Sequence, residues 1–125
     1  MLLLGASSTS VPQSRTAFDR ALPAMNGREL QMKVFEVAYA PGQKSAPHAH
    51  GCAVVVYVTS GAIRMGVRGS ADSVYKKGDT FFEQPTDIHQ VGENASATEP
   101  ATFTATMVCD RTVKPPQVPP PTDAR

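Results

Sequence analysis

The stretch GQKSAPHAHGCAVVVYVTSG, residues 42–61, joins a pair of histidines to a run of β-branched residues. His48 and His50 are separated by one residue, so on extended backbone both imidazoles lie on one face. Residues 53–59 are mostly β-branched, which predicts a strand covered on both sides. Gly61 ends the run. The stretch therefore predicts a buried strand that begins beside two potential metal ligands.

On both sides of this stretch, apolar and polar residues alternate with a period of two, which indicates further strands. Residues 63–67, 73–76, 81–82 and 103–107 are such segments, separated by turns rich in Gly, Pro and Asp. Residues 30–39 also alternate, but their apolar side switches near Val34, which predicts a bulge or a change of buried face. We expect no helix. Many short strands predict an all-β sandwich or barrel.

The chain has 125 residues, which fits one domain. Residues 1–17 are predicted to be a flexible lead-in, and residues 18–110 the β-barrel domain. Residues 111–125 are rich in proline, which has no amide donor for a sheet, so they are predicted to be a disordered tail.

Charge and hydropathy exclude several classes of partner. The net charge is +1, which argues against nucleic acid, and no stretch is long and apolar enough to span a membrane. The start, Met1–Ala6, is apolar but short and lacks basic residues. It favours a cytoplasmic location slightly, with export as the alternative if it is the remnant of a signal peptide.

The two cysteines, Cys52 and Cys109, do not form a CxxC pair. We expect them to be separate, small, buried side chains, with a disulfide as the alternative.

The chain contains three histidines, His48, His50 and His89. An HxH pair alone is a weak signal, but glycines frame these residues. Gly42 stands six residues before His48, Gly61 stands eleven after His50, and Gly78 stands eleven before His89. Three neutral imidazoles that converge from adjacent strands leave coordination positions open. Such a site suits a catalytic metal better than a closed structural one.

With these motifs the sequence resembles the cupin family. Residues 42–61 resemble its first motif, and Gly78–His89, with Asn94 beyond, resembles its second. The resemblance spans residues 30–108 and is closest to small single-domain cupins of the conserved β-barrel type. It implies a jelly-roll barrel of antiparallel strands and a homodimer. It also implies that His48, His50 and His89 bind one divalent transition metal ion, which could be Fe, Mn, Ni, Cu or Zn.

One departure from the family pattern affects the predicted site. The first motif usually supplies a glutamate four residues after its second histidine, and here that position is Val54. Glu83, Gln84, Cys52 or water could supply the missing ligand. Glu83 is the leading candidate, either as a ligand or as the catalytic residue that transfers a proton.

Resemblance to cupin dioxygenases favours a metal-dependent oxidoreductase that acts on a small molecule. An isomerase or lyase that uses the metal as a Lewis acid is an alternative, as is a non-catalytic protein that binds a metal or small ligand. The predicted pocket is apolar, which favours an aromatic or polyketide-like substrate. Its predicted lining residues are Val54, Val56, Met65, Phe82 and Met107.

Overall fold

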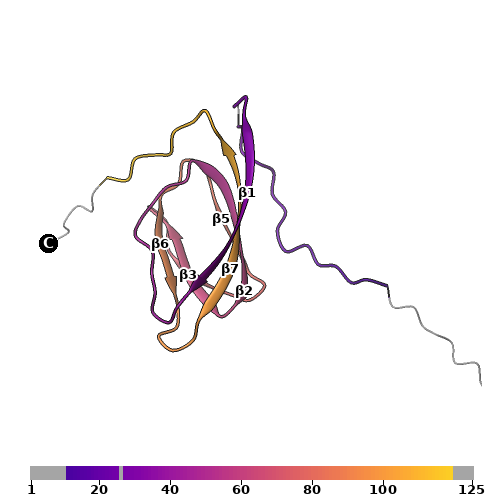
Figure 1. Cartoon of the computed structure of the whole chain (residues 1–125), viewed down its shortest axis with the longest axis vertical. Helices are drawn as coiled ribbons and strands as arrows, with labels where there is room; N and C mark the ends of the chain where they lie inside the picture. Colours follow the sequence, from indigo (N-terminus) through magenta and orange to yellow (C-terminus); the bar gives the residue numbers. More distant parts are fainter. Residues whose placement is uncertain (1–10, 26, 120–125) are drawn as a thin grey trace, which may run out of the picture.

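The computed structural model describes residues 11–25 and 27–119, which form antiparallel strands and no helix (Figure 1). The strands are β1 (Leu30–Tyr39), β2 (Cys52–Ser60), β3 (Ala62–Val67), β4 (Ser73–Lys76), β5 (Thr80–Glu83), β6 (His89–Asn94) and β7 (Ala101–Asp110). Within this part of the chain, no helix is present that could cross a membrane. The predicted all-β class is confirmed.

The strands form two sheets, with the orders β1-β7-β2-β5 and β4-β3-β6. In Figure 1, β1, β7 and β2 form one wall of the barrel, and β3 and β6 form the opposite wall. Their inner faces enclose a core of apolar side chains in which Val58 and Ile63 are fully buried. This is the jelly-roll architecture, in which alternate residues of each strand face the interior.

Gly61 allows the chain to pass from β2 in one sheet to β3 in the other. Its φ is +69°, and a Cβ at this position would lie 2.5 Å from the carbonyl oxygen of Pro100. A side chain here would meet backbone atoms that cannot move aside. The glycine that ends the first motif is therefore required by the crossing between sheets.

The register of the four-stranded sheet aligns its inward-facing residues in cross-strand rows. In one row, Lys33 lies opposite Met107, Met107 opposite Val54, and Val54 opposite Glu83. Directly opposite residues share a face of the sheet, so this row crosses the inner wall from β1 to β5. We call it the Lys33–Glu83 row.

Strand β1 corrects one prediction. It pairs with β7 in an unbroken register, so the bulge expected near Val34 is absent. The apolar side does switch, but the first half is not buried, because Leu30, Met32 and Val34 are 53%, 70% and 64% exposed. The cause is the parity of β1: Lys33 lies in the inward-facing row, so Leu30, Met32 and Val34 point outward from the barrel.

The other predicted strands lie where the alternation placed them, and β4 has the predicted bounds, Ser73–Lys76. Strand β6 was not predicted. Its sequence, HQVGEN, contains a single apolar side chain, so it carries no period-two signal. Its pairing with β3 is what makes it a strand.

The segment before β1 packs against β5, although it has no regular secondary structure. Phe18 stacks on Phe82 with 5.5 Å between ring centroids, and the Arg20 guanidinium lies 4.6 Å from the centre of the same ring. Arg15 donates a hydrogen bond to the Gly78 carbonyl. Residues 1–10 of the predicted lead-in and 120–125 of the predicted tail lie outside the described residues.

The expectation of two separate cysteines is wrong. Cys52 on β2 and Cys109 on β7 are directly opposite in the ladder, with 4.3 Å between their Cα atoms, and form a disulfide. They are 57 residues apart in the sequence. Only the β2–β7 register, which spacing alone could not reveal, brings them together.

Candidate metal centre

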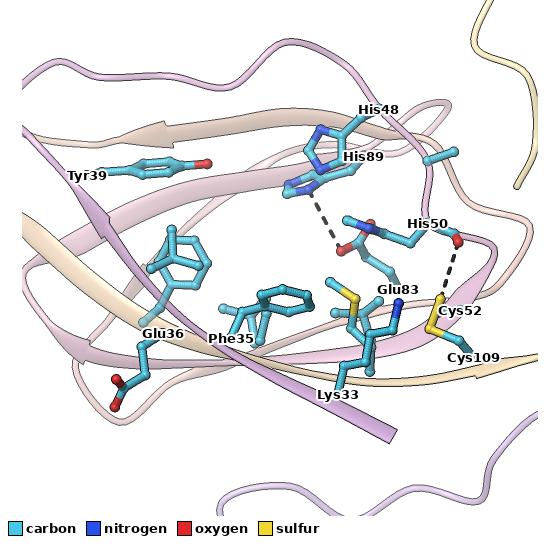
Figure 2. Close-up of a pocket in the computed structure, with 17 residues that line it drawn as sticks. Lys33, Phe35, Glu36, Tyr39, His48, His50, Cys52, Glu83, His89 and Cys109 are labelled. Atoms are coloured by element: carbon cyan, nitrogen blue, oxygen red, sulfur yellow. Dashed lines mark hydrogen bonds and ion pairs between the residues drawn. A yellow bond between two sulfur atoms is a disulfide. The ribbon is translucent and has the colours of Figure 1, made fainter. Parts of the chain in front are cut away.

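The three predicted histidine ligands converge at one end of the barrel (Figure 2). Each offers a ring nitrogen, and these atoms all lie within 4.8 Å of one another. Ring centroids are 4.7 Å apart for His48 and His50 and 4.9 Å apart for His48 and His89. The structure thus brings together residues from two segments that are about 40 positions apart in the sequence.

Backbone hydrogen bonds hold the two segments in register. The His48 N–H donates to the His89 carbonyl over 3.1 Å, and the His89 N–H donates to the His48 carbonyl over 2.8 Å. This isolated bridge lies before β2. The prediction that the HxH pair lies on a strand is therefore wrong, because β2 begins only at Cys52. Gly51, with φ +67°, then turns the chain into β2. The bridge therefore fixes the distance between His48 and His89.

A hydrogen bond orients the His48 imidazole. Its Nδ1 lies 2.7 Å from the Ala46 carbonyl oxygen. Because a carbonyl can only accept, Nδ1 is the donor, which leaves Nε2 as the ring nitrogen able to bind a metal. Metal-binding histidines are commonly oriented by such a contact.

The His89 imidazole is buried, with 5% of the residue exposed. Burial and, to a lesser extent, the neighbouring His48 lower the pKa of His89 from 6.5 to about 4. Burial and His48 also lower the pKa of His50. His89 is therefore neutral near pH 7, which is the form that binds a metal. Gly92 makes room for the ring, because a Cβ there would lie 3.2 Å from its Nε2.

Glu83 brings a carboxyl group to the same place. It is 2% exposed, and its Oε2 lies 3.8 Å from His89 Nδ1. Among the described residues, no lysine or arginine lies within ion-pair distance of this carboxyl group. Burial and, to a lesser extent, the charge of Asp87 raise the pKa of Glu83 from 4.5 to about 7. Because His89 is neutral, the contact is a polar contact rather than a strong ion pair.

The donor set fits a transition metal ion. Two donors that each bind one ion at about 2.1 Å lie at most about 4.2 Å apart. The separation of 3.8 Å between Glu83 Oε2 and His89 Nδ1 is within this limit, and the three histidine nitrogens all lie within 4.8 Å of one another. Imidazole nitrogens with a carboxylate suit iron, manganese, nickel, copper and zinc.

Two other candidates for the fourth ligand are ruled out by their positions. The Cys52 sulfur is bonded to Cys109 and offers no thiolate. Its Sγ lies 3.2 Å from the His50 carbonyl oxygen. Because the sulfur is in a disulfide and carries no proton, this contact is not a hydrogen bond. Gln84 does not line the site, and its backbone N–H bonds to Asp87 in the turn before His89. Glu83 remains.

A cavity of about 450 Å³ opens beside these groups. Val54, Val56 and Met107, three of the predicted lining residues, are on its wall. Met65 is instead buried against His89, with its sulfur 3.1 Å from Nε2. Phe82 points to the opposite face of the sheet, because Phe81 and Glu83 take the inward positions of β5.

One wall of the cavity was not predicted from the sequence. Phe35, Val37 and Tyr39 on β1 and Phe103 on β7 line it. Alternation along residues 35–39 carried the signal, since those three residues share one parity. The cavity therefore has imidazoles and a carboxyl group at one end and apolar or aromatic side chains over most of its length.

Comparison with protein families and known structures places this geometry in context. The family model described as the cupin domain matches residues 35–108. No curated protein matches the chain. Among solved structures, a cupin-like protein from Thermotoga maritima is similar with a TM-score of 0.57 and 23% identity. The match covers 65% of this chain and 59% of that chain.

Two further structures are similar. A DMSP lyase from Ruegeria pomeroyi has a TM-score of 0.58 and 15% identity, over 67% of this chain and 41% of that chain. An RmlC-like cupin family protein from Methanocaldococcus jannaschii has a TM-score of 0.57 and 12% identity, over 85% and 94% of the two chains. The chain thus spans less than two thirds of the Thermotoga protein and under half of the Ruegeria protein. At these identities the similarity establishes the fold.

Proposed function

The chain belongs to the cupin family, and from this we propose that it is a metal-dependent enzyme acting on a small molecule at the three-histidine site. The observation that carries the proposal is the position of Glu83. Its buried carboxyl group and three imidazoles face one end of a cavity whose remaining wall is mainly apolar. A structural metal site would need no substrate-sized cavity and no protonatable group beside it.

The reaction that we favour is oxidation of a chelating small molecule, as in cupin dioxygenases. His48, His50 and His89 would hold the ion, with the His48 ring oriented by the Ala46 carbonyl. The chemistry supplied by the bound metal is Lewis acidity and, for iron, manganese, nickel or copper, activation of dioxygen. Glu83 would take up the proton that an enol or phenol releases on binding. The apolar wall would exclude water and orient an aromatic or polyketide-like body.

A second candidate is a lyase or isomerase without redox chemistry. It is favoured by the same Glu83, whose carboxylate could accept a proton from the carbon next to a polarised carbonyl group. One structurally similar protein is a DMSP lyase, which is consistent with lyase chemistry on this fold. Here the three histidines would hold the ion, and Glu83 would carry the proton between two positions of the substrate.

Oxygen dependence separates the two candidates. Protein loaded in turn with iron, manganese, nickel, copper or zinc is incubated with β-diketones, catechols and hydroxy acids, with and without dioxygen. An oxygenase consumes dioxygen as it consumes substrate, whereas a lyase or isomerase forms product at the same rate without dioxygen. If no ion and no compound gives turnover in folded, loaded protein, the enzyme proposal is wrong and a non-catalytic binding protein is favoured.

A further inference from the structure

Lys33 and Glu83 occupy the two ends of the Lys33–Glu83 row on the inner wall of the barrel. Both line the cavity, with Met107 and Val54 between them. Glu83 is at the buried end beside the histidines. Lys33 is exposed and lies on β1, the edge strand, so it is at the mouth of the cavity. The row therefore joins the metal end of the cavity to a cation at its opening.

Lys33 is the one lysine or arginine among the residues that line the cavity. No carboxylate among the described residues lies within ion-pair distance of it. In Figure 2 its side chain extends from β1 toward the histidine end, whereas the Glu36 carboxylate points away. The ammonium group is therefore available to a ligand.

Lys33 is a charged residue on the face of β1 that otherwise carries apolar or aromatic side chains along the cavity. The next inward-facing residues along β1 are Phe35, Val37 and Tyr39, all apolar or aromatic, and all on the cavity wall. A lysine that served only solubility would suit the outward face, where Met32 and Val34 are instead exposed. A positive charge at an inward position of an apolar wall is an arrangement that selects an anion.

We propose that the substrate is a small organic anion, with a carboxylate at one end and a metal-chelating group at the other. The proposal deepens the function proposed for this cavity and rests on it. The carboxylate pairs with the Lys33 ammonium group, the apolar body lies along Met107 and Val54, and the chelating oxygens reach the histidine end. Three strand spacings of about 4.8 Å separate Lys33 from Glu83 along the sheet, and the curvature of the barrel shortens the direct path. One ring with a short acidic side chain fits this span.

The test compares catechol, which chelates but has no carboxylate, with three acids that extend it. These are 3,4-dihydroxybenzoate, 3,4-dihydroxyphenylacetate and 3-(3,4-dihydroxyphenyl)propionate. Their dissociation constants are measured by calorimetry on protein loaded with zinc, which is redox-inert. The dissociation constant of at least one acid should be lower than that of catechol by about threefold or more. This is the gain in affinity expected of a partly exposed ion pair. The gain should shrink as salt is raised.

Two variants assign the gain to Lys33. Lys33→Gln should abolish it while leaving the zinc content and the catechol affinity unchanged. Lys77→Gln removes an exposed lysine in the turn between β4 and β5 and should leave the gain intact. The proposal is overturned if no acid outbinds catechol in the wild type, if the gain survives in Lys33→Gln, or if Lys77→Gln removes it equally. Zinc content and turnover are measured separately, so a protein that prefers the acids but converts nothing contradicts the enzyme proposal alone.

Discussion

Glu83 stands directly opposite Val54 in the β2–β5 ladder. Val54 occupies the position at which the first cupin motif usually carries its glutamate, and directly opposite residues have Cβ atoms about 5 Å apart on one face of the sheet. The carboxyl group missing from β2 is therefore supplied from the neighbouring strand. This explains how the barrel keeps an acidic group beside His89 although its first motif lacks one.

Replacing Glu83 with Gln should abolish turnover but leave metal binding intact. The amide has the same shape, so the cavity keeps its volume, but it cannot accept or release the proton. We expect a fall in kcat of about 10²-fold or more, with about one metal ion per chain retained. Metal analysis and steady-state kinetics are the measurements, and Glu36→Gln on β1 is the matched control. Loss of metal from Glu83→Gln would mean that Glu83 is a ligand and would contradict the catalytic role.

The pH dependence of stability in metal-free protein should reveal two opposing groups. Folding lowers the pKa of His89 from 6.5 to about 4, so the unfolded chain binds more protons in that range and stability rises with pH. Folding raises the pKa of Glu83 from 4.5 to about 7, so its contribution is complete below 4.5 and is lost as pH rises through 7. In the wild type the two slopes offset each other between about pH 4.5 and 6.5.

Single substitutions should separate these slopes. With Glu83→Gln, the free energy of unfolding should increase from pH 4 to 6.5 because only the two histidines with lowered pKa values, His89 and His50, remain. With His89→Gln, it should decrease from pH 4.5 to 7 because the large Glu83 shift then outweighs the opposing His50 shift. Urea unfolding in the presence of a chelator measures both. If the free energy of unfolding changed with pH in the same way in both variants, the pKa shifts assigned to His89 and Glu83 would be contradicted.

Removing the disulfide should weaken the barrel without affecting the metal. The bond closes a loop of 57 residues between β2 and β7, and the chain-entropy model gives about 4 kcal/mol for a loop of that size. We expect the double variant Cys52→Ala, Cys109→Ala to lose stability of this order in urea unfolding while zinc content is unchanged. A variant that stays stable but loses zinc would show that the sulfur atoms support the site itself.

The outward face of β1 is the predicted contact of a homodimer. Leu30, Met32 and Val34 form an exposed apolar stripe on an edge strand, which a soluble monomer seldom presents. The double variant Met32→Lys, Val34→Lys should convert a dimer into a monomer, as measured by light scattering after gel filtration. Val74→Lys on β4, where the side chain is 41% exposed, is the control. A wild type that is monomeric at micromolar concentration contradicts the prediction.

Local spacing was enough to predict the histidine site and most strands, because alternation and glycine framing are properties of short segments. The features that local spacing left open or got wrong depend on register. The Cys52–Cys109 bond requires β2 to pair with β7, and the inward position of Glu83 requires a one-residue choice of parity in Phe81-Phe82-Glu83. That choice also sent Phe82 outward, against the prediction. Two adjacent phenylalanines leave the parity undetermined until the partner strand fixes it.

Metal analysis of tag-free protein tests the central claim most directly. After incubation with iron, manganese, nickel, copper or zinc and removal of excess ion, the wild type should retain close to one ion per chain. His89→Ala should retain far less while keeping its β-sheet circular dichroism, because His48 and His50 alone leave the site incomplete. A folded wild type that retains none of these ions, or a His89→Ala variant that retains as much as the wild type, would contradict the three-histidine site.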